Sequence, residues 1–409
     1  GCLLLPRGET VAVRSAYLAA SDRPEEWVRP SDPPDALVKP LLYSHPTSSP
    51  RPSPIPTAAR FPDWVQSLAE VDLWPAPGLV AGGGPDRKDG PITVPKGSYL
   101  KVLESAGDRF LVYHGGDDEQ EAVEGWVDSA LLSPSRAPRW VIVRRPTRMA
   151  LAAGTQGGST LGLPERAVLE VLEHSEGELR ALYLGDGHLQ DAAEGWVRAA
   201  DLGPAGAMLV GEKRGVRLLG KQEVATLRSG GGLWLKVPYR SQLDGSPSAD
   251  ANCGPASVGM AMAAHGTFVP TEELRAVANK LQGTWGTDTG FAIEYLQSVV
   301  ERYGLRGRDL YVGADFKRWT VDDVRGHLVQ GHPVIPQLRF RLMPGRAQSD
   351  YYEDHYVVLT GVLGDDFIYN DPVDSDGPGY GRLMSVEALV RAWGGSYFPF
   401  AAFAVSFIS

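Results

Sequence analysis

The chain has 409 residues, a length that suggests two to four domains. Its composition, 43% apolar and 22% charged, is typical of a globular protein. Its formal net charge is −10, and no block of Lys and Arg stands out, which argues against nucleic acid as a partner. No uncharged apolar run reaches the roughly 18 residues that a membrane helix needs, so no transmembrane segment is expected. The oligomeric state stays open.

The chain has two cysteines, Cys2 and Cys253, which is too few for a scaffold of several disulfides or a cysteine-based zinc site. Cys2 lies in "GCLLLP" and is either the remnant of a lipid-anchored export signal or an ordinary thiol. No cluster of His and carboxylate residues has metal-ligand spacing, so neither a metal nor a cofactor is expected.

Residues 29–57 are dense in Pro and Ser, a composition that favours extended backbone over a packed core. We therefore predict that residues 1–57 are an N-terminal segment that ends in a linker. Residues 1–28 are too few to assign to a module.

An internal repeat follows this linker. The stretch "YLKVLESAGDRFLVYHGGDDEQEAVEGWV" at 99–127 matches "VLEVLEHSEGELRALYLGDGHLQDAAEGWV" at 168–197. In each copy, short alternating runs are separated by Gly and Asp turns, which is typical of a small antiparallel sheet or barrel.

Repeated short strands that end in "GWV" resemble the bacterial SH3-like module. The resemblance predicts one small all-β barrel at 58–136 and a second at 137–207. Trp126 and Trp196 are expected to pack in the core or as a lid of these barrels, because small barrels need large side chains to fill them. A ligand groove built around the two tryptophans is the alternative.

The pattern of apolar residues changes after the repeats, from short alternating runs to longer helix-like segments. Residues 208–231 end in "RSGGG" and are predicted to be a linker. From 232 onward, four helix-like segments with Thr or Gly boundaries precede three short strand-like runs. Helices followed by antiparallel strands predict an α+β domain at 232–409, long enough to fold alone.

Cys253, in "ADANCGPASV", is the first candidate for chemistry. Gly254 and Pro255 follow it, and proline is favoured in the first helical turn, where its missing N–H would have no partner. Cys253 is therefore predicted at a helix N-terminus, where the helix dipole favours a thiolate. A lone cysteine is usually a small buried residue, so this interpretation depends on partner residues.

Three residues have the chemistry of such partners. Gln242 lies eleven residues before the thiol and is a candidate oxyanion donor. His355 begins the strand-like run "DHYVVLTG", and Asp371 ends the next run sixteen residues later. Adjacent antiparallel strands joined by "GVLGDD" would place Asp371 beside His355, where it orients the imidazole. Asp354 precedes His355 and is expected to point to the other face of the strand.

The motifs "VPYRSQ", "NCGPASVGMAM", "GHPVIPQ", "DHYVVLTG" and "YNDP" resemble the C39-like cysteine peptidases, a branch of the papain-like fold, over residues 232–409. The resemblance implies Cys253 as nucleophile, His355 as general base and acid, Asp371 as orienting carboxylate and Gln242 as oxyanion donor. The expected fold is therefore multidomain, with two SH3-like barrels followed by an α+β papain-like cysteine peptidase domain. Its expected substrate is a peptide or protein.

Two other functions stay open at this point. The first is a peptidoglycan endopeptidase or amidase, since paired SH3-like modules before a cysteine hydrolase suit the cell wall; such hydrolases usually carry "DCSG" where this chain has "NCGP". The second is a non-catalytic binding protein of the cell envelope. Either would bind cell-wall peptide through the modules, and all three hypotheses favour an extracellular or envelope location.

Overall fold

The computed structural model describes residues 62–75, 90–116, 122–151, 159–185, 187 and 189–408. All described residues lie within one compact unit, residues 59–409. The predicted N-terminal segment and its Pro/Ser-rich linker, together with Cys2, lie outside the described residues.

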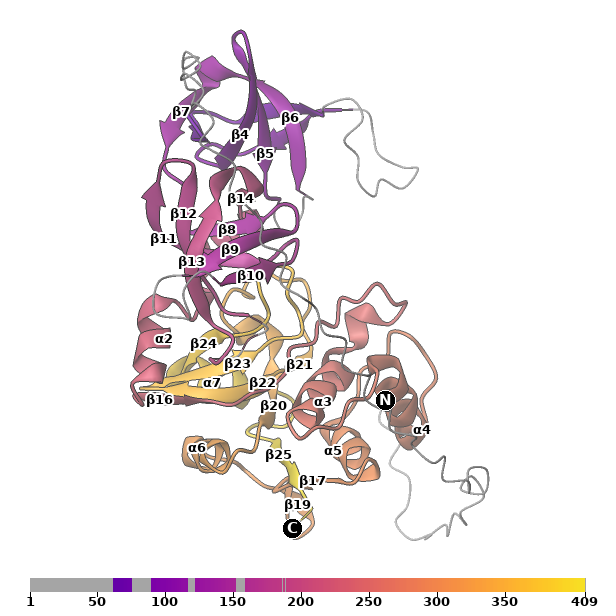
Figure 1. The fold of residues 1–409 in the computed structure, drawn as a ribbon. Helices are drawn as coiled ribbons and strands as arrows, with labels where there is room; N and C mark the ends of the chain where they lie inside the picture. Colours follow the sequence, from indigo (N-terminus) through magenta and orange to yellow (C-terminus); the bar gives the residue numbers. More distant parts are fainter. Residues whose placement is uncertain are drawn as a thin grey trace, which may run out of the picture. The chain divides into compact units, whose positions relative to one another are not determined.

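The repeat forms two antiparallel sheets with matching strand order (Figure 1). The first sheet contains β1 (Trp64–Ser67), β2 (Val71–Pro75), β3 (Ile92–Val94), β4 (Tyr99–Ala106), β5 (Arg109–His114), β6 (Val123–Asp128) and β7 (Leu132–Ser135). The second contains β8 (Trp140–Val143), β9 (Thr147–Leu151), β10 (Thr160–Leu163), β11 (Val168–Ser175), β12 (Glu178–Tyr183), β13 (Ala193–Arg198) and β14 (Leu202–Pro204). The orders are β3-β2-β6-β5-β4-β1-β7 and β10-β9-β13-β12-β11-β8-β14.

Details of the register also repeat. The pairing of β4 with β5 shifts between Val102 and Glu104, and that of β11 with β12 shifts between Val171 and Glu173. The predicted repeat is therefore a structural repeat. Among the described residues, the outer strands of each curled sheet do not pair with each other, so closure into an SH3-like barrel stays a prediction.

The two tryptophans of the repeated "GWV" motif do not fill the cores. Side chains alternate along a strand, and in this motif the following Val127 and Val197 face inward. Trp126 and Trp196 are only half-buried. The expectation that they lie in the core is therefore wrong, and a position at the lid of each sheet stays a prediction.

The C-terminal region is built on an antiparallel sheet in the order β15-β24-β23-β22-β20-β25-β17, with β16 paired to β22 and β21 paired to β20. These strands are β15 (Arg217–Leu218), β16 (Gly232–Trp234), β17 (Leu305–Arg308), β20 (Val334–Arg339), β21 (Asp354–Tyr356), β22 (Val358–Leu363), β23 (Asp366–Asn370), β24 (Arg382–Ser385) and β25 (Ala402–Phe407). A separate hairpin joins β18 (Tyr311–Val312) to β19 (Asp315–Phe316).

Helices cover both faces of this sheet (Figure 1). On one face lie α3 (Cys253–Ala263), α4 (Thr271–Gln282) and α5 (Ile293–Arg302); on the other lie α6 (Val321–Val329) and α7 (Val386–Gly394). Alternate residues of the central strands serve the two cores: Ile335 and Phe403 contact the first, Val334 and Ala404 the second. The four helices expected from the sequence and the strands after them are confirmed.

The predicted linker at 208–231 is wrong for most of its length. This stretch contains most of α1 (Gly206–Lys213), then β15 and α2 (Lys221–Arg228), and β15 pairs with β24 as a strand of the C-terminal sheet. Leu219 and Leu227 share a core with Trp234 of that sheet and with Leu182 of the second repeat. Both helices are short and lie among glycines, a pattern that is typical of loops. For this reason the sequence does not reveal that the apolar residues of this stretch are buried.

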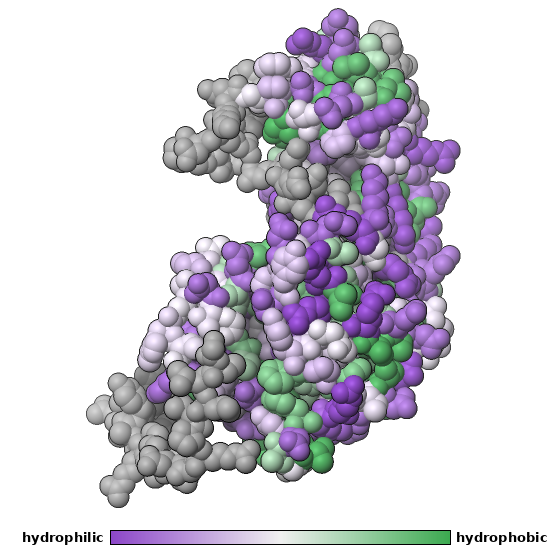
Figure 2. All heavy atoms as spheres, turned by 180° about the vertical axis from the view of Figure 1, so that it is seen from behind, coloured by the Kyte–Doolittle hydropathy of each residue, from purple (hydrophilic) through white to green (hydrophobic). Residues whose placement is uncertain are grey.

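Charged and polar side chains cover much of the face seen in Figure 2, where apolar residues form small groups. This agrees with the ordinary charged fraction of 22% and the net charge of −10. Among the described residues, no helix combines the length and apolar character needed to cross a membrane.

Candidate active site

Cys253 is the first residue of α3 and is buried, with 9% of its surface exposed. Gly254 allows the start of α3 to approach α5, since a methyl group on Gly254 would lie 2.9 Å from the Leu296 side chain. The predicted place of the thiol at a helix N-terminus is confirmed. The N–H groups of the first turn have no intrahelical acceptor and give this end a positive potential.

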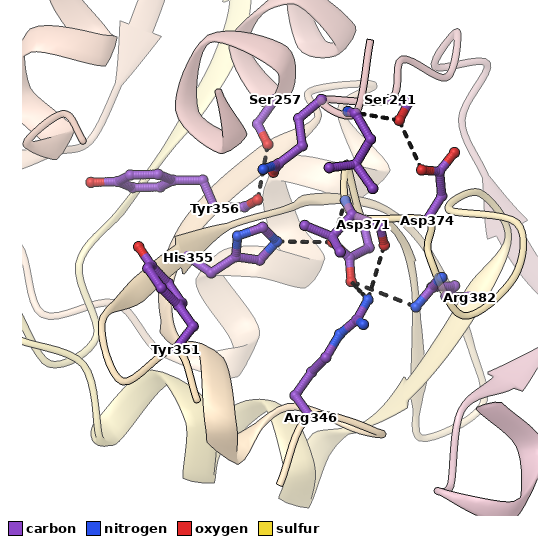
Figure 3. A network of polar contacts seen from close by, with 12 residues as sticks. Ser241, Ser257, Arg346, Tyr351, His355, Tyr356, Asp371, Asp374 and Arg382 are labelled. Carbon is purple, nitrogen blue, oxygen red and sulfur yellow. Dashed lines mark hydrogen bonds and ion pairs between the residues drawn. The ribbon is translucent and has the colours of Figure 1, made fainter. Parts of the chain in front are cut away.

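His355 lies on β21, and Asp371 directly follows β23. Nε2 of His355 is 2.8 Å from Oδ1 of Asp371 (Figure 3). His355 also hydrogen-bonds the Cys253 side chain. Both His355 and Asp371 are buried. The structure therefore brings Cys253, His355 and Asp371 into one hydrogen-bonded series, in the order expected from the sequence.

A second contact aligns the helix with the strand. Ser257 lies one turn after Cys253 on α3, and its hydroxyl donates to the backbone oxygen of Tyr356, 3.1 Å away (Figure 3). Tyr356 follows His355 and donates its own hydroxyl to the backbone oxygen of Phe291. These bonds connect α3 and the segment before α5 to β21, and they set the position of the thiol relative to the imidazole.

The charges of this series act together on its pKa values. Burial lowers the pKa of His355, but the adjacent Asp371 carboxylate raises it more, to about 9. Burial raises the pKa of the Cys253 thiol, but the hydrogen bond and charge of His355 bring it below its ordinary value. The arrangement therefore favours a thiolate and an imidazolium over a neutral pair.

Gln242 is hydrogen-bonded both to the segment that carries Asp371 and to the turn that precedes Cys253. Its backbone N–H donates to the oxygen of Pro372, next to Asp371, and its side-chain Nε2 donates to the oxygen of Ala249, 2.9 Å away. Ala249 begins the 3-10 turn that leads into Cys253. An amide nitrogen carries two hydrogens, so the second N–H of Gln242 remains for another acceptor.

Asp354 has the orientation expected of it. Its Oδ2 accepts from Gln337 at 2.8 Å and from the backbone N–H of Tyr397 at 2.7 Å, and Arg339 lies 3.3 Å from its Oδ1. These partners belong to β20 and to the loop after α7. Asp354 therefore stabilises the edge of the sheet and does not orient His355.

The ring of His355 also has an aromatic neighbour. Phe340 packs edge-on against it at 5.0 Å between ring centroids, and Tyr351 packs edge-on against Phe340 at 5.4 Å. Tyr351 is 44% exposed, whereas Phe340 is buried. One wall of the site is thus aromatic, and it shields the imidazole from water.

Sequence reasoning missed a group of buried charges beyond Asp371. Arg346 Nη2 donates to Oδ2 of Asp371 at 3.0 Å (Figure 3). The same nitrogen donates to Oδ1 of Asp376 at 3.2 Å. Arg382 donates to Oδ1 of Asp376 at 2.7 Å and lies 3.6 Å from Oδ2 of Asp371. Two arginines thus alternate with two aspartates, and all four are buried. The one signal in the sequence is "DPVDSD", which concentrates acids that need counter-charges.

Comparison with known proteins supports the resemblance found in the sequence. Residues 234–397 match the model of the Peptidase_C39 like family. The match includes the positions of Gln242, Cys253, His355 and Asp371. The resemblance of the C-terminal region to C39-like peptidases is therefore confirmed, and the match begins after α1 and α2.

Solved structures give more distant similarities. A C39-like peptidase from Bacillus anthracis is 17% identical, with a TM-score of 0.31, and the match covers 44% of this chain and 98% of that one. The peptidase domain of Streptococcus ComA is 18% identical, with a TM-score of 0.26, covering 39% and 93%. An NlpC/P60 family protein from Bacillus cereus is 11% identical, with a TM-score of 0.15, covering 83% and 98%. A search of curated proteins matched none of them to this chain.

Proposed function

We propose that the region matching the Peptidase_C39 like family hydrolyses peptide bonds, with Cys253 as nucleophile, His355 as general base and acid, and Asp371 as the orienting carboxylate. The observation that carries this proposal is the buried hydrogen-bonded series of these three residues at the start of α3. Nucleophile, base and orienting acid in contact are what thiol-dependent hydrolysis requires.

In the first half of the reaction, the Cys253 thiolate attacks the carbonyl carbon of the scissile bond. The carbonyl oxygen becomes an oxyanion, and the tetrahedral intermediate then expels the amine. The imidazolium of His355 gives its proton to that amine, which leaves a thioester on Cys253 and a neutral imidazole.

In the second half, the neutral His355 accepts a proton from water. The resulting hydroxide attacks the thioester carbon, and collapse of the second tetrahedral intermediate releases the carboxylic acid product and the Cys253 thiolate. The imidazolium is restored in the same step. Throughout, the Asp371 carboxylate stabilises the positive charge on His355 without taking its proton.

Gln242 is the proposed oxyanion donor. Its bond to Ala249 fixes the amide next to the turn that leads into Cys253, and its second N–H is the one that would meet the oxyanion. The backbone N–H of Cys253, at the start of α3, would be the second donor.

For the two N-terminal repeats we propose a targeting role, as SH3-like modules that bind peptide of the cell wall. Their duplicated sheets and their fusion to a peptidase-like region support it. An extracellular or envelope location follows from this proposal. Tethering to a polymer would raise the local substrate concentration without altering the chemistry at Cys253.

The test compares wild-type protein with Cys253→Ala on a peptide library, on casein and on cell-wall sacculi. We expect Cys253→Ala to lose about a thousandfold or more in rate. Its free energy of unfolding should change by no more than about 2 kcal/mol, because a single sulfur is removed. Cleavage of casein would support a protein substrate, and cleavage of sacculi alone would support a peptidoglycan hydrolase.

A second measurement addresses a non-catalytic role. An activated thiolate reacts with iodoacetamide at neutral pH faster than a free model thiol does. A Cys253 that reacts no faster than the model thiol, in a wild-type protein that cleaves none of these substrates, would reject the proposed function and support a non-catalytic role.

A further inference from the structure

The loop between β23 and β24 carries Asp376, one of the two aspartates in the buried charge group. Arg382 holds the backbone of this loop on one side, since it donates to the oxygens of Pro378 and Gly377 at 2.9 and 3.1 Å. Asp376 is 1% exposed. Another part of the chain must therefore cover the Asp376 side chain on the side that Arg382 leaves open.

That cover is α1, which precedes the family match. The backbone of Gly211 lies so close to this loop that a methyl group on it would be 2.6 Å from the backbone oxygen of Asp376. Met208 packs against Gly377, whose own added methyl would be 2.7 Å from the Met208 sulfur. Both contacts come from the same face of α1, three residues apart.

The residue before Arg346 is contacted by the same segment. Val216 follows α1 and is buried against Gly345, where an added methyl group would lie 2.4 Å from the valine side chain. The segment from Met208 to Val216 therefore packs on both loops that supply the charge group, the one with Arg346 and the one with Asp376.

The position of this group affects the imidazole through Asp371. Arg346 binds Oδ2 of Asp371, which leaves Oδ1 to face His355 at 2.8 Å. Asp376 balances the charge of Arg346 and fixes its direction, with 3.1 Å between Arg346 Nη1 and Asp376 Oδ2. A shift of Asp376 would therefore move Arg346, and with it the carboxylate that polarises His355.

We propose that α1 and Val216 are a positioning element of the active site, acting through Asp376 and Arg346 on the carboxylate of Asp371. This inference rests on the proposed function for the role of Asp371. It assigns a part in the chemistry to a segment outside the residues that match the peptidase family. Gly211 and Val216 are positioning residues, since neither contacts the reacting atoms.

The test is Gly211→Ala in the full chain, with Gly326→Ala as the matched control. Both glycines lie inside helices, so both changes raise helix propensity to a similar extent. A methyl group at Gly326 meets nothing within 4 Å, whereas one at Gly211 pushes against Asp376. The control therefore separates the contact with Asp376 from the change in helix propensity.

The first readout is the pH dependence of Cys253 alkylation by iodoacetamide, which needs no substrate. If Asp371 moves away from His355, the imidazolium is less stable and the thiolate forms at higher pH. We expect the alkylation midpoint of Gly211→Ala to move to higher pH, and that of Gly326→Ala to stay at the wild-type value. A wild-type midpoint in a folded Gly211→Ala protein would overturn the proposal.

The second readout is hydrolysis of a short soluble peptide. We expect kcat of Gly211→Ala to fall on the order of tenfold or more at nearly unchanged KM, because a small misplacement of a catalytic group slows the chemical step. Failure of the proposed function itself would be recognised separately, by a wild-type protein without hydrolysis or a Cys253→Ala protein with it.

If Gly211→Ala does not fold, Val216→Ala replaces it. This change removes a contact with Gly345 and introduces no clash, so we expect the same upward shift of the alkylation midpoint with smaller amplitude. A Val216→Ala protein that is less stable but has the wild-type midpoint would show that the segment only stabilises the fold, and would reject the proposal.

Discussion

His355 is the residue through which the charges of the candidate site are coupled. Its ring hydrogen-bonds Cys253 and meets Asp371 at 2.8 Å. Its protonation state therefore decides whether the thiol is ionised below its ordinary pKa. Phe340 and the burial of the ring keep water from weakening this effect.

We expect the rate of peptide hydrolysis to follow a bell-shaped pH curve. The rate rises when Cys253 becomes a thiolate, at a pH below its ordinary pKa, and falls when His355 loses its proton near pH 9. The measurement is kcat/KM of the wild-type protein from acid to alkaline pH. A rate that keeps rising well above pH 9 would contradict a protonated His355 in the active form.

Asp371→Asn and His355→Ala should differ in stability as well as rate. Without the Asp371 carboxylate, Asp376 is the one buried acid among the described residues left to pair with Arg346 and Arg382. We expect the free energy of unfolding to fall by about 3–5 kcal/mol, because a buried positive charge loses its partner. His355→Ala keeps both arginines paired, so its free energy of unfolding should fall less. Urea unfolding and kcat are measured on both variants.

We also expect His355→Ala to lose the reaction, and Asp371→Asn to keep a slow residual rate, since the acid orients the base without accepting its proton. An Asp371→Asn protein with wild-type stability would contradict the role of Asp371 as partner of the two arginines.

At the scale of elements, α4 supports the start of α3 through one buried side chain. Arg275 donates to the oxygen of Ala251 at 3.2 Å and to Oδ1 of Asn252 at 3.1 Å, directly before Cys253. It also donates to the backbone oxygens of Gly286 and Thr289, in the loop between α4 and α5. The helix start that carries the thiol is thus braced from a neighbouring helix.

Arg275→Met should lower the free energy of unfolding by at least about 2 kcal/mol, because four acceptors lose a charged donor. Arg302→Met on α5 is the control, since Arg302 is exposed, and its effect should stay within about 0.5 kcal/mol. Both are measured by urea unfolding. Equal effects of the two substitutions would contradict the bracing role of Arg275.

At the scale of the whole molecule, the described repeats and the C-terminal region are not joined by a simple linker. Leu182, Leu184 and Ala192 of the second repeat share a core with α2 and with Ile368 of the C-terminal sheet. Trp140 of the same repeat donates its indole N–H to Glu212 of α1 at 2.5 Å. The boundary expected at residue 232 therefore cuts through a packed core.

A protein shortened to residues 232–409 should be less stable than one comprising residues 59–409. The shorter chain lacks β15, α1 and α2 and leaves Trp234, Ile368 and Leu383 without their buried partners. We expect a lower Tm and slower hydrolysis of a short soluble peptide. Equal Tm and equal rate would support the independent domain that the sequence predicts.

Local signals in the sequence were enough to place Cys253. A Gly-Pro pair starts a helix at the thiol, as local sequence predicts. The short turn between β22 and β23 brings Asp371 back toward the residues before β22, but His355 lies on the separate strand β21, which pairs with β20 and not with β23. The expected pairing of adjacent strands is therefore correct only in part. Local sequence also predicts the repeat, whose strands and turns recur in its residues. The roles of these residues in catalysis stay predictions.

Only the tertiary structure decided which residues surround Asp371. Asp376 and Arg382 lie in and at the end of the loop between β23 and β24, whereas Arg346 comes from a distant loop, and no periodicity in the sequence relates them. The packing of α1 on Asp376 requires glycine at position 211. In the sequence this residue cannot be distinguished from the other glycines of the predicted linker. Such contacts arise from the burial of apolar and charged groups between distant segments, so they depend on the whole fold and not on local sequence.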